Sequence, residues 1–323
     1  MRIIEQLNKL PVNKGEYLVL PDIDTPFFII PMQSRIIFKK AVRFIKPKNK
    51  HGWIKKILLS IIPFSLIRSF FYTIKISTNF NEQYPQLILP WNQDFDNKFV
   101  IFNLKSKPTL IKVGFKDAKS LIKNENKTIS HILVKNNQIA PVVLNYEETK
   151  SYSLIETNFY HGKHPELLPD AIRNFFLSIY KESQSITFSH HPYIRRMISS
   201  VYKKLDKTKY KDILNQIDSY IEEFANINIP ICIMHGDCTR TNIIVNNEET
   251  IIIDWEECIL DGVPIDVEYF AFRNNLDKTQ AWKIKDEIDF LVVLHYIHFQ
   301  CLYSNHTRLE KISWIQDTVS LKR

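Results

Sequence analysis

Glycine is scarce in this sequence, with six residues among 323, and neither a Walker A motif nor a G-x-G-x-x-G motif is present. Both motifs use glycine-rich loops to bring backbone amides to phosphate groups. Any nucleotide must therefore be held by other groups. Cysteine is scarce too, and because the four residues include no C-x-x-C pair, we expect neither a structural zinc site nor a disulfide framework.

Acidic residues are missing from one long segment. Residues 35–75 contain no Asp or Glu but eleven basic residues, which are Arg35, Lys39, Lys40, Arg43, Lys46, Lys48, Lys50, Lys55, Lys56, Arg68 and Lys75. The net charge of the whole chain is +8, so the rest of the chain is slightly acidic. Positive charge concentrated in this way predicts a surface that faces an anionic partner.

The same segment lacks a hydrophobic run long enough to cross a bilayer. Its longest run without a charge, residues 57–67, has eleven residues, whereas a membrane span needs about 20. Apolar residues in 54–62 and 64–74 follow helical spacing on either side of Pro63, which predicts basic amphipathic helices. Such helices either lie on an anionic membrane surface or pack on the protein and expose their lysines. The sequence leaves both open.

Length and composition indicate a folded protein with more than one lobe. Hydrophobic residues make up 45% of the 323 residues, enough for a sizeable core. No secretory signal peptide opens the chain, and free cysteines suit a reducing compartment. We therefore expect a cytoplasmic protein, with peripheral contact to the inner face of the membrane as a second expectation.

One stretch, residues 235–254, carries most of the polar chemistry: HGDCTRTNIIVNNEETIIID. The apolar residues before it, 231–234, predict a buried strand that stops at His235. After a polar loop, two apolar segments flank a polar cluster at 246–249, which predicts a β-hairpin. A strand, a loop and a hairpin are therefore expected in this order.

The hairpin is expected to bring two oxygen-bearing side chains together. If its turn is centred on Glu248, Asn242 lies directly opposite Asp254, and the Cβ atoms of such partners are about 4.5–5.5 Å apart. Magnesium prefers a carboxylate with neutral oxygens and keeps several waters for substrate phosphates. Asp237, just upstream, is left free to orient a hydroxyl group. The spacing therefore predicts a phosphoryl-transfer site.

These residues also have a simpler explanation than a metal site. Asp and Asn near a turn most often satisfy backbone amides. A buried strand that ends on Asp254, however, places a charge where burial is costly unless the charge is paired or bound to a metal. The combination of strand, Asp, Asn and hairpin favours the metal site.

The stretch resembles the aminoglycoside phosphotransferase and choline kinase family, which is distantly related to protein kinases. The family's I-D-W-E segment matches residues 253–256, and its H-G-D-x-x-x-x-N motif matches His235, Gly236, Asp237 and Asn242. The resemblance implies that Asp237 is the catalytic base and that Asn242 and Asp254 bind magnesium.

Other positions follow from the same resemblance. It implies that His235 braces the catalytic loop and that Asp266, in the segment GVPIDVEYF, supports it. The chain departs from the family between the aspartate and the asparagine, where an aromatic residue or proline is usual and residues 238–241 are CTRT. Arg240 in this gap either pairs a phosphate or is solvated, and both interpretations stay open.

Residues from about 87 to 157 predict a small β-rich lobe. The runs 99–104 and 109–113 predict two strands joined by KSKP, and a helix is expected over 117–134. Lys112 lies in the second strand and Glu125 lies in the helix. The resemblance implies that Lys112 holds the α- and β-phosphates of a nucleotide and that Glu125 fixes this lysine.

Two further nucleotide contacts are expected in this lobe. The segment 90–99, PWNQDFDNKF, stands where the family has its phosphate-covering loop, although it contains no glycine. Residues 151–157 predict the last strand of the lobe, and the backbone of Ile155, Glu156 and Thr157 would meet the adenine.

From Pro165 onward, apolar residues recur at helical spacing. We expect helices over 166–182, 210–225 and 282–303. His295 and His298 lie near the apolar stripe of the last helix, and we expect both to be core residues.

These features together predict an α+β, two-lobed protein-kinase-like fold. Residues 1–84 are expected to form a basic, amphipathic and helical N-terminal extension, residues 85–158 a β-rich nucleotide-binding lobe, and residues 159–323 a helical lobe with the catalytic loop and the acceptor site. The expected reaction uses ATP and Mg²⁺ to phosphorylate a hydroxyl group of a small molecule, with a saccharide or an envelope glycolipid favoured. GTP in place of ATP stays open.

Three alternative functions can be compared with this one. The first is a non-catalytic, kinase-like nucleotide-binding module at the membrane surface, and the intact Asp237, Asn242 and Asp254 argue against it. The second is nucleic-acid binding through the basic segment, but the sequence shows no aromatic platform or recognition motif, so we expect no nucleic acid partner. A protein-kinase role is disfavoured because the DFG and APE signatures are absent.

Overall fold

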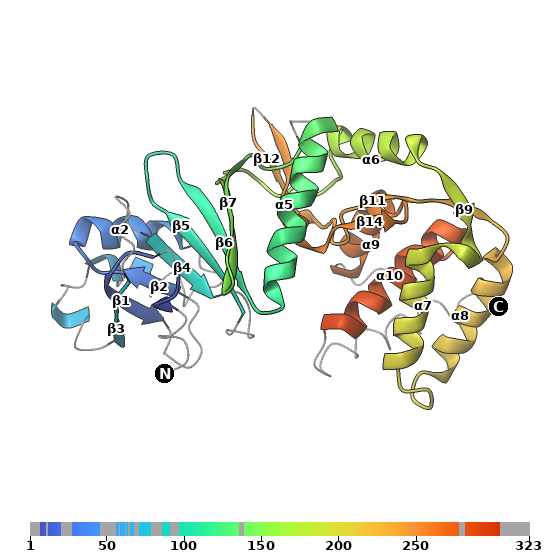
Figure 1. The fold of residues 1–323 in the computed structure, drawn as a ribbon, viewed down its shortest axis with the longest axis horizontal. Helices are drawn as coiled ribbons and strands as arrows, with labels where there is room; N and C mark the ends of the chain where they lie inside the picture. Colours follow the sequence, from blue (N-terminus) through green and yellow to red (C-terminus); the bar gives the residue numbers. More distant parts are fainter. Residues whose placement is uncertain are drawn as a thin grey trace. The chain divides into compact units, whose positions relative to one another are not determined.

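The computed structural model describes residues 7–10, 12–20, 28–45, 56–57, 59–61, 63, 65–67, 71–78, 86–90, 97–135, 139–247, 249–277 and 282–303. The chain divides into two compact units, and Figure 1 labels helices and strands of both. The N-terminal unit comprises Met1–Lys135 and Pro141–Tyr160, and the C-terminal unit comprises Asn136–Ala140 and His161–Arg323.

The N-terminal unit is built on one eight-stranded sheet in which every pairing is antiparallel, with strand order β3-β1-β2-β4-β5-β6-β8-β7. The strands are β1 Gly15–Leu20, β2 Phe28–Pro31, β3 Thr73–Ile76, β4 Gln86–Pro90, β5 Lys98–Asn103, β6 Thr109–Phe115, β7 Val143–Glu148 and β8 Tyr152–Asn158. Apolar residues of β1, β4, β5 and β6 form a buried cluster on this sheet. The central strands are therefore held by side chains as well as by backbone hydrogen bonds.

Helix α5, Ala118–Lys135, covers part of the sheet and makes its main contacts with β6 and β8. Its apolar residues Ile122 and Ile129 are fully buried. The chain passes from β6 to α5 in a tight turn, and a Cβ atom on Gly114 would lie 2.3 Å from the Ala118 carbonyl oxygen. Only glycine permits this approach, which fixes α5 beside the strand that carries Lys112.

The sequence predicted a helical N-terminal extension, but the structure contains strands there as well as helix. The described part contains α2 at Arg35–Phe44 and further helical residues at 56–57, 59–61 and 65–67, but it also supplies β1, β2 and β3 to the sheet. The reason is burial, because apolar residues of these strands join the same cluster as those of β4 and β5. In the predicted helical ranges 54–62 and 64–74, residues 56–57, 59–61 and 65–67 are helical and β3 begins at Thr73, whereas residues 54–55, 58, 62, 64 and 68–70 lie outside the described residues.

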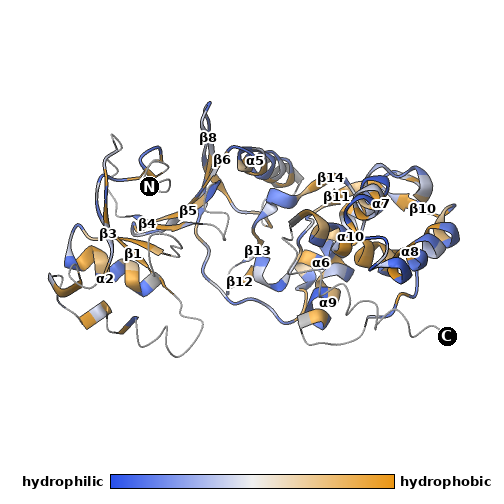
Figure 2. Ribbon diagram, turned by 90° about the horizontal axis from the view of Figure 1, so that it is seen from below, coloured by the Kyte–Doolittle hydropathy of each residue, from blue (hydrophilic) through white to orange (hydrophobic). Residues whose placement is uncertain are grey.

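The C-terminal unit is mainly helical. Its helices are α6 Asp170–Glu182, α7 Pro192–Lys204, α8 Lys211–Phe224, α9 Asp266–Asp277 and α10 Glu287–Tyr303. The segments between the helices contain three two-stranded sheets. These pair β9 Ser185–Thr187 with β10 Asn228–Pro230, β11 Cys232–Met234 with β14 Ile259–Gly262, and β12 Ile243–Val245 with β13 Thr250–Ile252. Much of α10 is hydrophobic (Figure 2), and its Phe290 ring lies 5.1 Å from Tyr220 and 5.9 Å from Phe224 of α8. Buried residues of α7, α8, α9 and α10 together form the core of this unit.

The predicted α+β class is confirmed, with an antiparallel sheet in the N-terminal unit and a helical C-terminal unit. The predicted boundaries at residues 84 and 158 stay predictions. Within the described residues, no helix combines the length and the hydropathy that a bilayer span requires.

Candidate active site

The catalytic loop predicted at His235–Asn242 follows the buried strand β11 and passes through Gly236 in a left-handed conformation, with φ 85°. A Cβ atom on Gly236 would lie 2.4 Å from the carbonyl oxygen of Glu257. Both the positive φ and the close approach require glycine. The loop is therefore pressed against the segment after β13, which carries Asp254.

His235 braces this loop, as the resemblance implied. Its side chain is fully buried, and its Nδ1 accepts a hydrogen bond of 3.2 Å from the backbone N–H of Asp237. Because Nδ1 is an acceptor, the proton lies on Nε2, which donates to the Ile253 carbonyl oxygen at 3.0 Å. The ring also contacts Trp255 at a centroid distance of 4.5 Å. A neutral His235 therefore ties Asp237 to the end of β13.

Asp266, the first residue of α9, supports the loop from its other side. Its two carboxylate oxygens accept the backbone N–H of His235 at 3.2 and 3.1 Å, and Tyr180 donates to it at 3.4 Å. Burial raises the pKa of Asp266 to about 7, and the hydrogen bonds from the backbone of His235 and Gly236 and from Tyr180 oppose this rise. The role that the resemblance implied for Asp266 is confirmed as a structural one.

Asp237 lies near the start of the loop with its side chain 28% exposed. The amide nitrogen of Asn242 donates to the Asp237 backbone carbonyl at 2.9 Å and to its carboxylate Oδ2 at 3.1 Å. Because the nitrogen is used in this way, the amide oxygen of Asn242 is left as a ligand atom. The structure thus brings together the predicted base and one predicted metal ligand.

The predicted register of the hairpin is wrong by one residue. Ile243 pairs with Ile252 and Val245 pairs with Thr250. The Asn242 carbonyl therefore accepts from the backbone N–H of Ile253, whereas the predicted residue opposite Asn242 was Asp254. The cause is the turn, in which Asn246 and Glu249 pair with each other and leave two residues at the tip.

Asp254 lies at a sharp corner of the chain just after β13, not opposite Asn242 in the hairpin. It adopts the left-handed conformation, with φ 68° and ψ 53°, and turns the chain from β13 into the short helix Trp255–Glu257. Among residues other than glycine, Asp and Asn tolerate this conformation best. Backbone strain of this kind is concentrated at functional sites. Asp254 is half-buried at this corner.

Negative charge accumulates around Asp237. Its pKa is raised, first by burial and then by the charges of Asp254 and Glu256, while the Arg273 charge and the hydrogen bond from Asn242 oppose the rise. Glu256 is buried, and the sequence analysis gave it no role. A divalent cation would neutralise this cluster, and Asn242 and Asp254 offer oxygen atoms of the kind magnesium prefers. The donor set therefore fits the predicted metal.

Two residues at this site were not predicted from the sequence. Arg273 of α9 donates to the Asp237 carboxylate at 3.4 Å, and His295 of α10 bonds through Nε2 to the Gly236 carbonyl oxygen at 2.7 Å. Tyr193 of α7 lies 2.8 Å from the other ring nitrogen of His295. Burial lowers the pKa of His295 to about 3, so the ring is neutral and donates to the loop. Both residues are far from the motif in sequence, and no local pattern marks them.

Lys112 and Glu125 form the ion pair that the resemblance implied, within the N-terminal unit. The Lys112 ammonium lies 2.7 and 2.9 Å from the two carboxylate oxygens of Glu125. Both side chains are buried, at 9% and 3% exposed. Strand β6 presents the lysine and helix α5 presents the glutamate, and the close approach of Ala118 to Gly114 of β6 keeps the two elements together.

Removing Lys112 is expected to destabilise the N-terminal unit. Lys112→Met takes away both hydrogen bonds to a buried carboxylate, and breaking such a pair costs about 3–5 kcal/mol. The double variant Lys112→Met, Glu125→Leu should recover most of this loss. Lys123→Met is the matched control, since its pair with Glu148 is exposed and therefore contributes little to stability. Urea denaturation measures all three, and equal losses for the buried and exposed pairs would contradict the argument.

Ile155, Glu156 and Thr157 are not at a free edge, contrary to the expected adenine contact. They lie inside β8, which pairs with β6 on one side and β7 on the other. The Glu156 carboxylate accepts hydrogen bonds from Thr109 and from Lys105. The backbone of these three residues is thus used within the sheet, because each one has partners on both neighbouring strands.

Two other expectations have plain outcomes. Most of the loop at 90–99 lies outside the described residues.

Arg240 pairs with Glu166 at 2.7 Å on the surface of the C-terminal unit, with 44% and 62% of the two side chains exposed. Such an exposed pair is weak, so Arg240 remains available to other anions.

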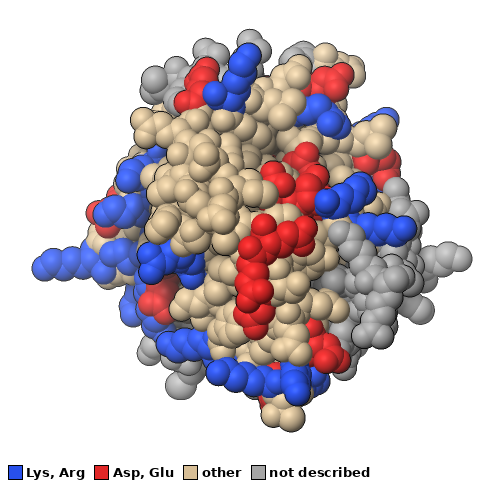
Figure 3. All heavy atoms as spheres, turned by 90° about the vertical axis from the view of Figure 1, so that its right-hand side faces the viewer, with Lys and Arg blue, Asp and Glu red and all other residues tan. Residues whose placement is uncertain are grey.

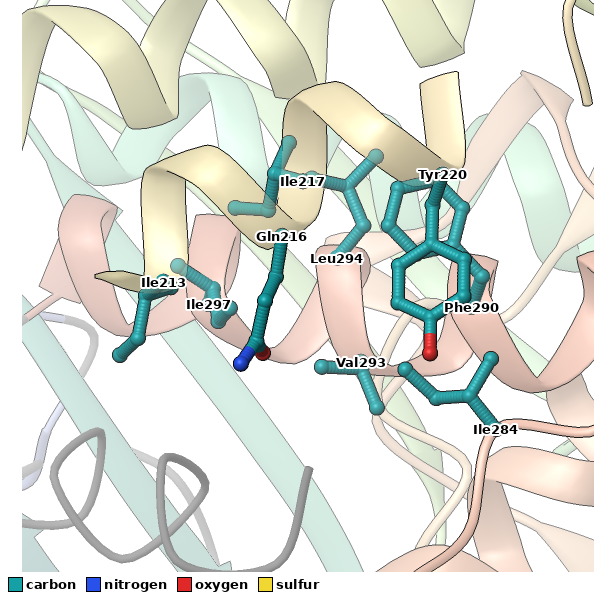
Figure 4. A pocket seen from close by; sticks show the side chains of 9 residues that line it. All are labelled: Ile213, Gln216, Ile217, Tyr220, Ile284, Phe290, Val293, Leu294 and Ile297. Atoms are coloured by element: carbon teal, nitrogen blue, oxygen red, sulfur yellow. The ribbon is translucent and has the colours of Figure 1, made fainter. Parts of the chain in front are cut away.

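A separate pocket lies between α8 and α10 (Figure 4). It is lined by Ile213, Gln216, Ile217, Tyr220, Ile284, Phe290, Val293, Leu294 and Ile297. Its lining contains no charged side chain, so this pocket does not suit phosphate or a metal ion.

Comparison with known proteins supports the resemblance. Residues 190–270 match the model of the phosphotransferase enzyme family, and this segment contains Asp237, Asn242, Asp254 and Asp266. The resemblance to that family is therefore confirmed over this segment. No curated protein matches the sequence.

Solved structures with a similar chain path include a thermostable mutant of aminoglycoside phosphotransferase APH(4)-Ia, at 13% identity and TM-score 0.46, covering 73% of this chain and 92% of that one. A putative fructosamine-3-kinase from Haemophilus somnus 129PT has 13% identity and TM-score 0.42, covering 69% and 85%. Aminoglycoside phosphotransferase APH(3'')-Id from Streptomyces rimosus has 13% identity and TM-score 0.39, covering 68% and 87%. Likeness at this level carries no information on substrate.

Proposed function

We propose that this protein is a phosphotransferase that moves the γ-phosphoryl group of ATP to a hydroxyl group of a small molecule, with Mg²⁺ as cofactor. The observation that carries the proposal is the Asp237 carboxylate held by Asn242 within the charge field of Asp254. A base, an amide oxygen and a second carboxylate at one loop are the parts that phosphoryl transfer requires. The family match over the same loop supports it.

Each residue has a proposed role in the transfer. Asp237 orients the acceptor hydroxyl and accepts its proton as the new O–P bond forms. Asn242 and Asp254 would hold the magnesium ion, which neutralises charge on the phosphates when bound. Lys112, fixed by Glu125, binds the α- and β-phosphates of the nucleotide. Asp266, His235 and His295 hold the loop and do not take part in proton transfer.

The nucleotide-binding role of the β-rich residues 85–158 and the acceptor role of residues 159–323 remain part of this proposal. For Ile155, Glu156 and Thr157 we propose an indirect role, since they hold the strand from which the chain leaves toward residues 158–162. The backbone beyond Asn158 is then the better candidate for contact with the base of the nucleotide.

Phosphate incorporation tests the proposal. The full chain, Mg²⁺ and γ-labelled ATP are incubated with a panel of sugars, polyols and glycan fragments, and labelled products are separated. Transfer that requires both Mg²⁺ and Asp237 is the expected result. A protein that binds Mg-ATP but transfers to no acceptor and releases no ADP would instead be the non-catalytic nucleotide-binding module.

We also propose peripheral contact with an anionic membrane through residues 35–75. Isoleucines 36, 57 and 61 are 81%, 57% and 67% exposed, and they lie among the basic residues of this segment. Exposed apolar side chains beside lysine and arginine fit an anionic lipid surface. Three of the basic residues, Arg35, Lys40 and Lys56, also donate to backbone carbonyls, so part of this charge serves the fold.

One face of the C-terminal unit contrasts with this basic segment. Figure 3 shows acidic side chains gathered near the centre of that face, with lysine and arginine around its edge. Helix α8 contributes Asp212, Asp218, Glu222 and Glu223 to the unit. Mixed charge of this kind does not form the basic stripe that nucleic acid requires.

Substitution of the exposed isoleucines is expected to weaken membrane contact. Ile36→Gln with Ile61→Gln should lower binding to phosphatidylglycerol vesicles at least about tenfold, because each buried isoleucine contributes about 1.5–3 kcal/mol. Leu167→Gln, which is 83% exposed in the C-terminal unit, is the control. Deletion of residues 1–80 is unsuitable, since it removes β1–β3 from the sheet. Vesicle co-sedimentation that is equal for wild type and the double variant would exclude the contact.

A further inference from the structure

Arg273 reaches the catalytic loop from the second half of α9. Its Nη1 donates to the Asp237 carboxylate at 3.4 Å and to the Tyr269 hydroxyl at 3.0 Å. The Arg273 and Asp237 side chains are each 28% exposed. The guanidinium is therefore beside the proposed base and is still open to a ligand.

Two tyrosines hold the guanidinium in place. Its central carbon lies 5.7 Å from the ring centroid of Tyr269 and 5.8 Å from that of Tyr296. Both tyrosines are buried, on α9 and α10 respectively, so they give a rigid support. Cation–π contacts of this kind fix arginine and reduce the entropy it loses on binding.

Most of the donors of Arg273 are unused. In the part of the chain that the structure describes, only Nη1 makes hydrogen bonds with protein groups, whereas Nε and Nη2 make none. These two nitrogens lie on the side of the guanidinium that binds carboxylate or phosphate in a bidentate manner. An arginine that served only to neutralise Asp237 would not need them.

The position of this charge has a consequence for the acceptor. The hydroxyl to be phosphorylated must lie within hydrogen-bond reach of Asp237, and Arg273 is 3.4 Å from the same carboxylate. A group bound by the unused nitrogens is then close to the reacting hydroxyl. A fixed guanidinium attracts an oxyanion and repels an ammonium group.

We propose that Arg273 binds an oxyanion of the acceptor, so that the preferred acceptor is an anionic alcohol, such as a sugar or polyol that carries a carboxylate or a phosphate ester near its reactive hydroxyl. The inference rests on the proposed phosphotransferase function. It assigns Arg273 as the residue that determines acceptor specificity and disfavours polycationic amino sugars.

The test compares acceptors that differ in one charged group. With the full chain, Mg²⁺ and labelled ATP, glucose is compared with glucuronate and with glucose 6-phosphate, glycerol with glycerol 3-phosphate, and kanamycin serves as the polycation. We expect the anionic member of at least one pair to exceed its neutral partner by about 10- to 100-fold in kcat/KM, the range of a charge-assisted hydrogen bond. The better anionic member then identifies carboxylate or phosphate.

Variants of Arg273 separate anion binding from other roles. Arg273→Gln should abolish the preference for the anionic member, and Arg273→Lys should reduce it about tenfold, because lysine keeps the charge but loses the fork. Lysine should also preserve the acid limb of the pH profile of kcat/KM, whereas glutamine should shift it upward, since the Arg273 charge opposes the rise in the pKa of Asp237. Arg196→Gln is the control, because Arg196 pairs with Asp261 away from the loop.

The possible failures are distinguishable. If wild type transfers phosphate with equal efficiency to neutral and anionic members, or if Arg273→Gln lowers both equally, the acceptor inference is wrong while the phosphotransferase function stands. The second result would mean that Arg273 contacts the transferred phosphoryl group instead. If Mg-ATP does not bind and no acceptor is phosphorylated, the proposed function fails and this inference fails with it.

Discussion

Asp237→Asn is expected to reduce kcat for phosphoryl transfer by about 100- to 10,000-fold, the usual contribution of a general base. Affinity for Mg-ATP should be nearly unchanged, because the substitution keeps the shape of the side chain and the hydrogen bond from the backbone of Asp237 to His235. Stability should stay equal or rise. The pKa of Asp237 is raised by burial and by Asp254 and Glu256, so its charged form is disfavoured in the folded protein.

The pH dependence of the wild type follows from the same environment. When the pKa of an acidic group is higher in the folded than in the unfolded protein, the free energy of unfolding falls as the pH rises through that range. For catalysis the sign is opposite, because Asp237 must be deprotonated to act as a base. The acid limb of kcat/KM should therefore lie above pH 3.8, the ordinary pKa of aspartate.

Asp261→Asn is the matched control for this substitution. Asp261 forms a bidentate pair with Arg196, and that pair lowers the pKa of Asp261, so its charged form is favoured. Its removal should leave transfer unchanged and reduce stability by less than about 1 kcal/mol, as expected for a partly exposed pair. Asp237→Asn should thus lower activity without lowering stability, whereas Asp261→Asn should lower stability slightly without lowering activity. Full turnover in Asp237→Asn would remove the assigned base.

Asp254→Asn is expected to lower the affinity for Mg-ATP by more than about 100-fold. Loss of an outer-shell partner of a metal ligand typically costs about 10- to 100-fold, and loss of a ligand itself costs more. Asparagine is preferred to alanine here, because Asp254 has φ 68° and asparagine tolerates this conformation. The backbone at the corner after β13 should then be preserved.

Glu249→Gln, in the turn of the same hairpin, is the control for the second substitution. Glu249 is exposed, and its backbone N–H donates to the Asn246 side chain. Its Oε1 also accepts from the Asn246 amide at 3.4 Å, and the amide oxygen of glutamine can accept the same bond. Calorimetric titration with an ATP analogue, with and without Mg²⁺, measures both variants. An Asp254→Asn protein that binds Mg-ATP as the wild type does would contradict the assignment of this metal ligand.

The elements that sequence predicted well are those with a strong local pattern. The strand expected at 109–113 is β6 Thr109–Phe115, the helix expected at 117–134 is α5 Ala118–Lys135, and the helix expected at 210–225 is α8 Lys211–Phe224. Apolar spacing specifies each of these without knowledge of the rest of the chain. The ion pair of Lys112 and Glu125 was implied by the family resemblance, which both residues match by their order in the chain.

The features that sequence did not predict depend on distant contacts. Strands β1 and β2 were missed, since they are stabilised by pairing with each other and with β3 and β4. The hairpin register depended on whether an odd or an even number of residues occupies the turn, which composition alone does not decide. Arg273 and His295 reach the loop from helices 36 and 59 residues away along the chain.

The most direct test of the account is titration of the wild-type protein with a non-hydrolysable ATP analogue in the presence and absence of Mg²⁺. The account predicts stoichiometric binding that tightens at least about tenfold with Mg²⁺, because Asn242 and Asp254 would share the cation with the nucleotide phosphates. Affinity that is the same with Mg²⁺ and with a chelator, or no binding in either condition, would contradict the claim that this loop is a magnesium–nucleotide site.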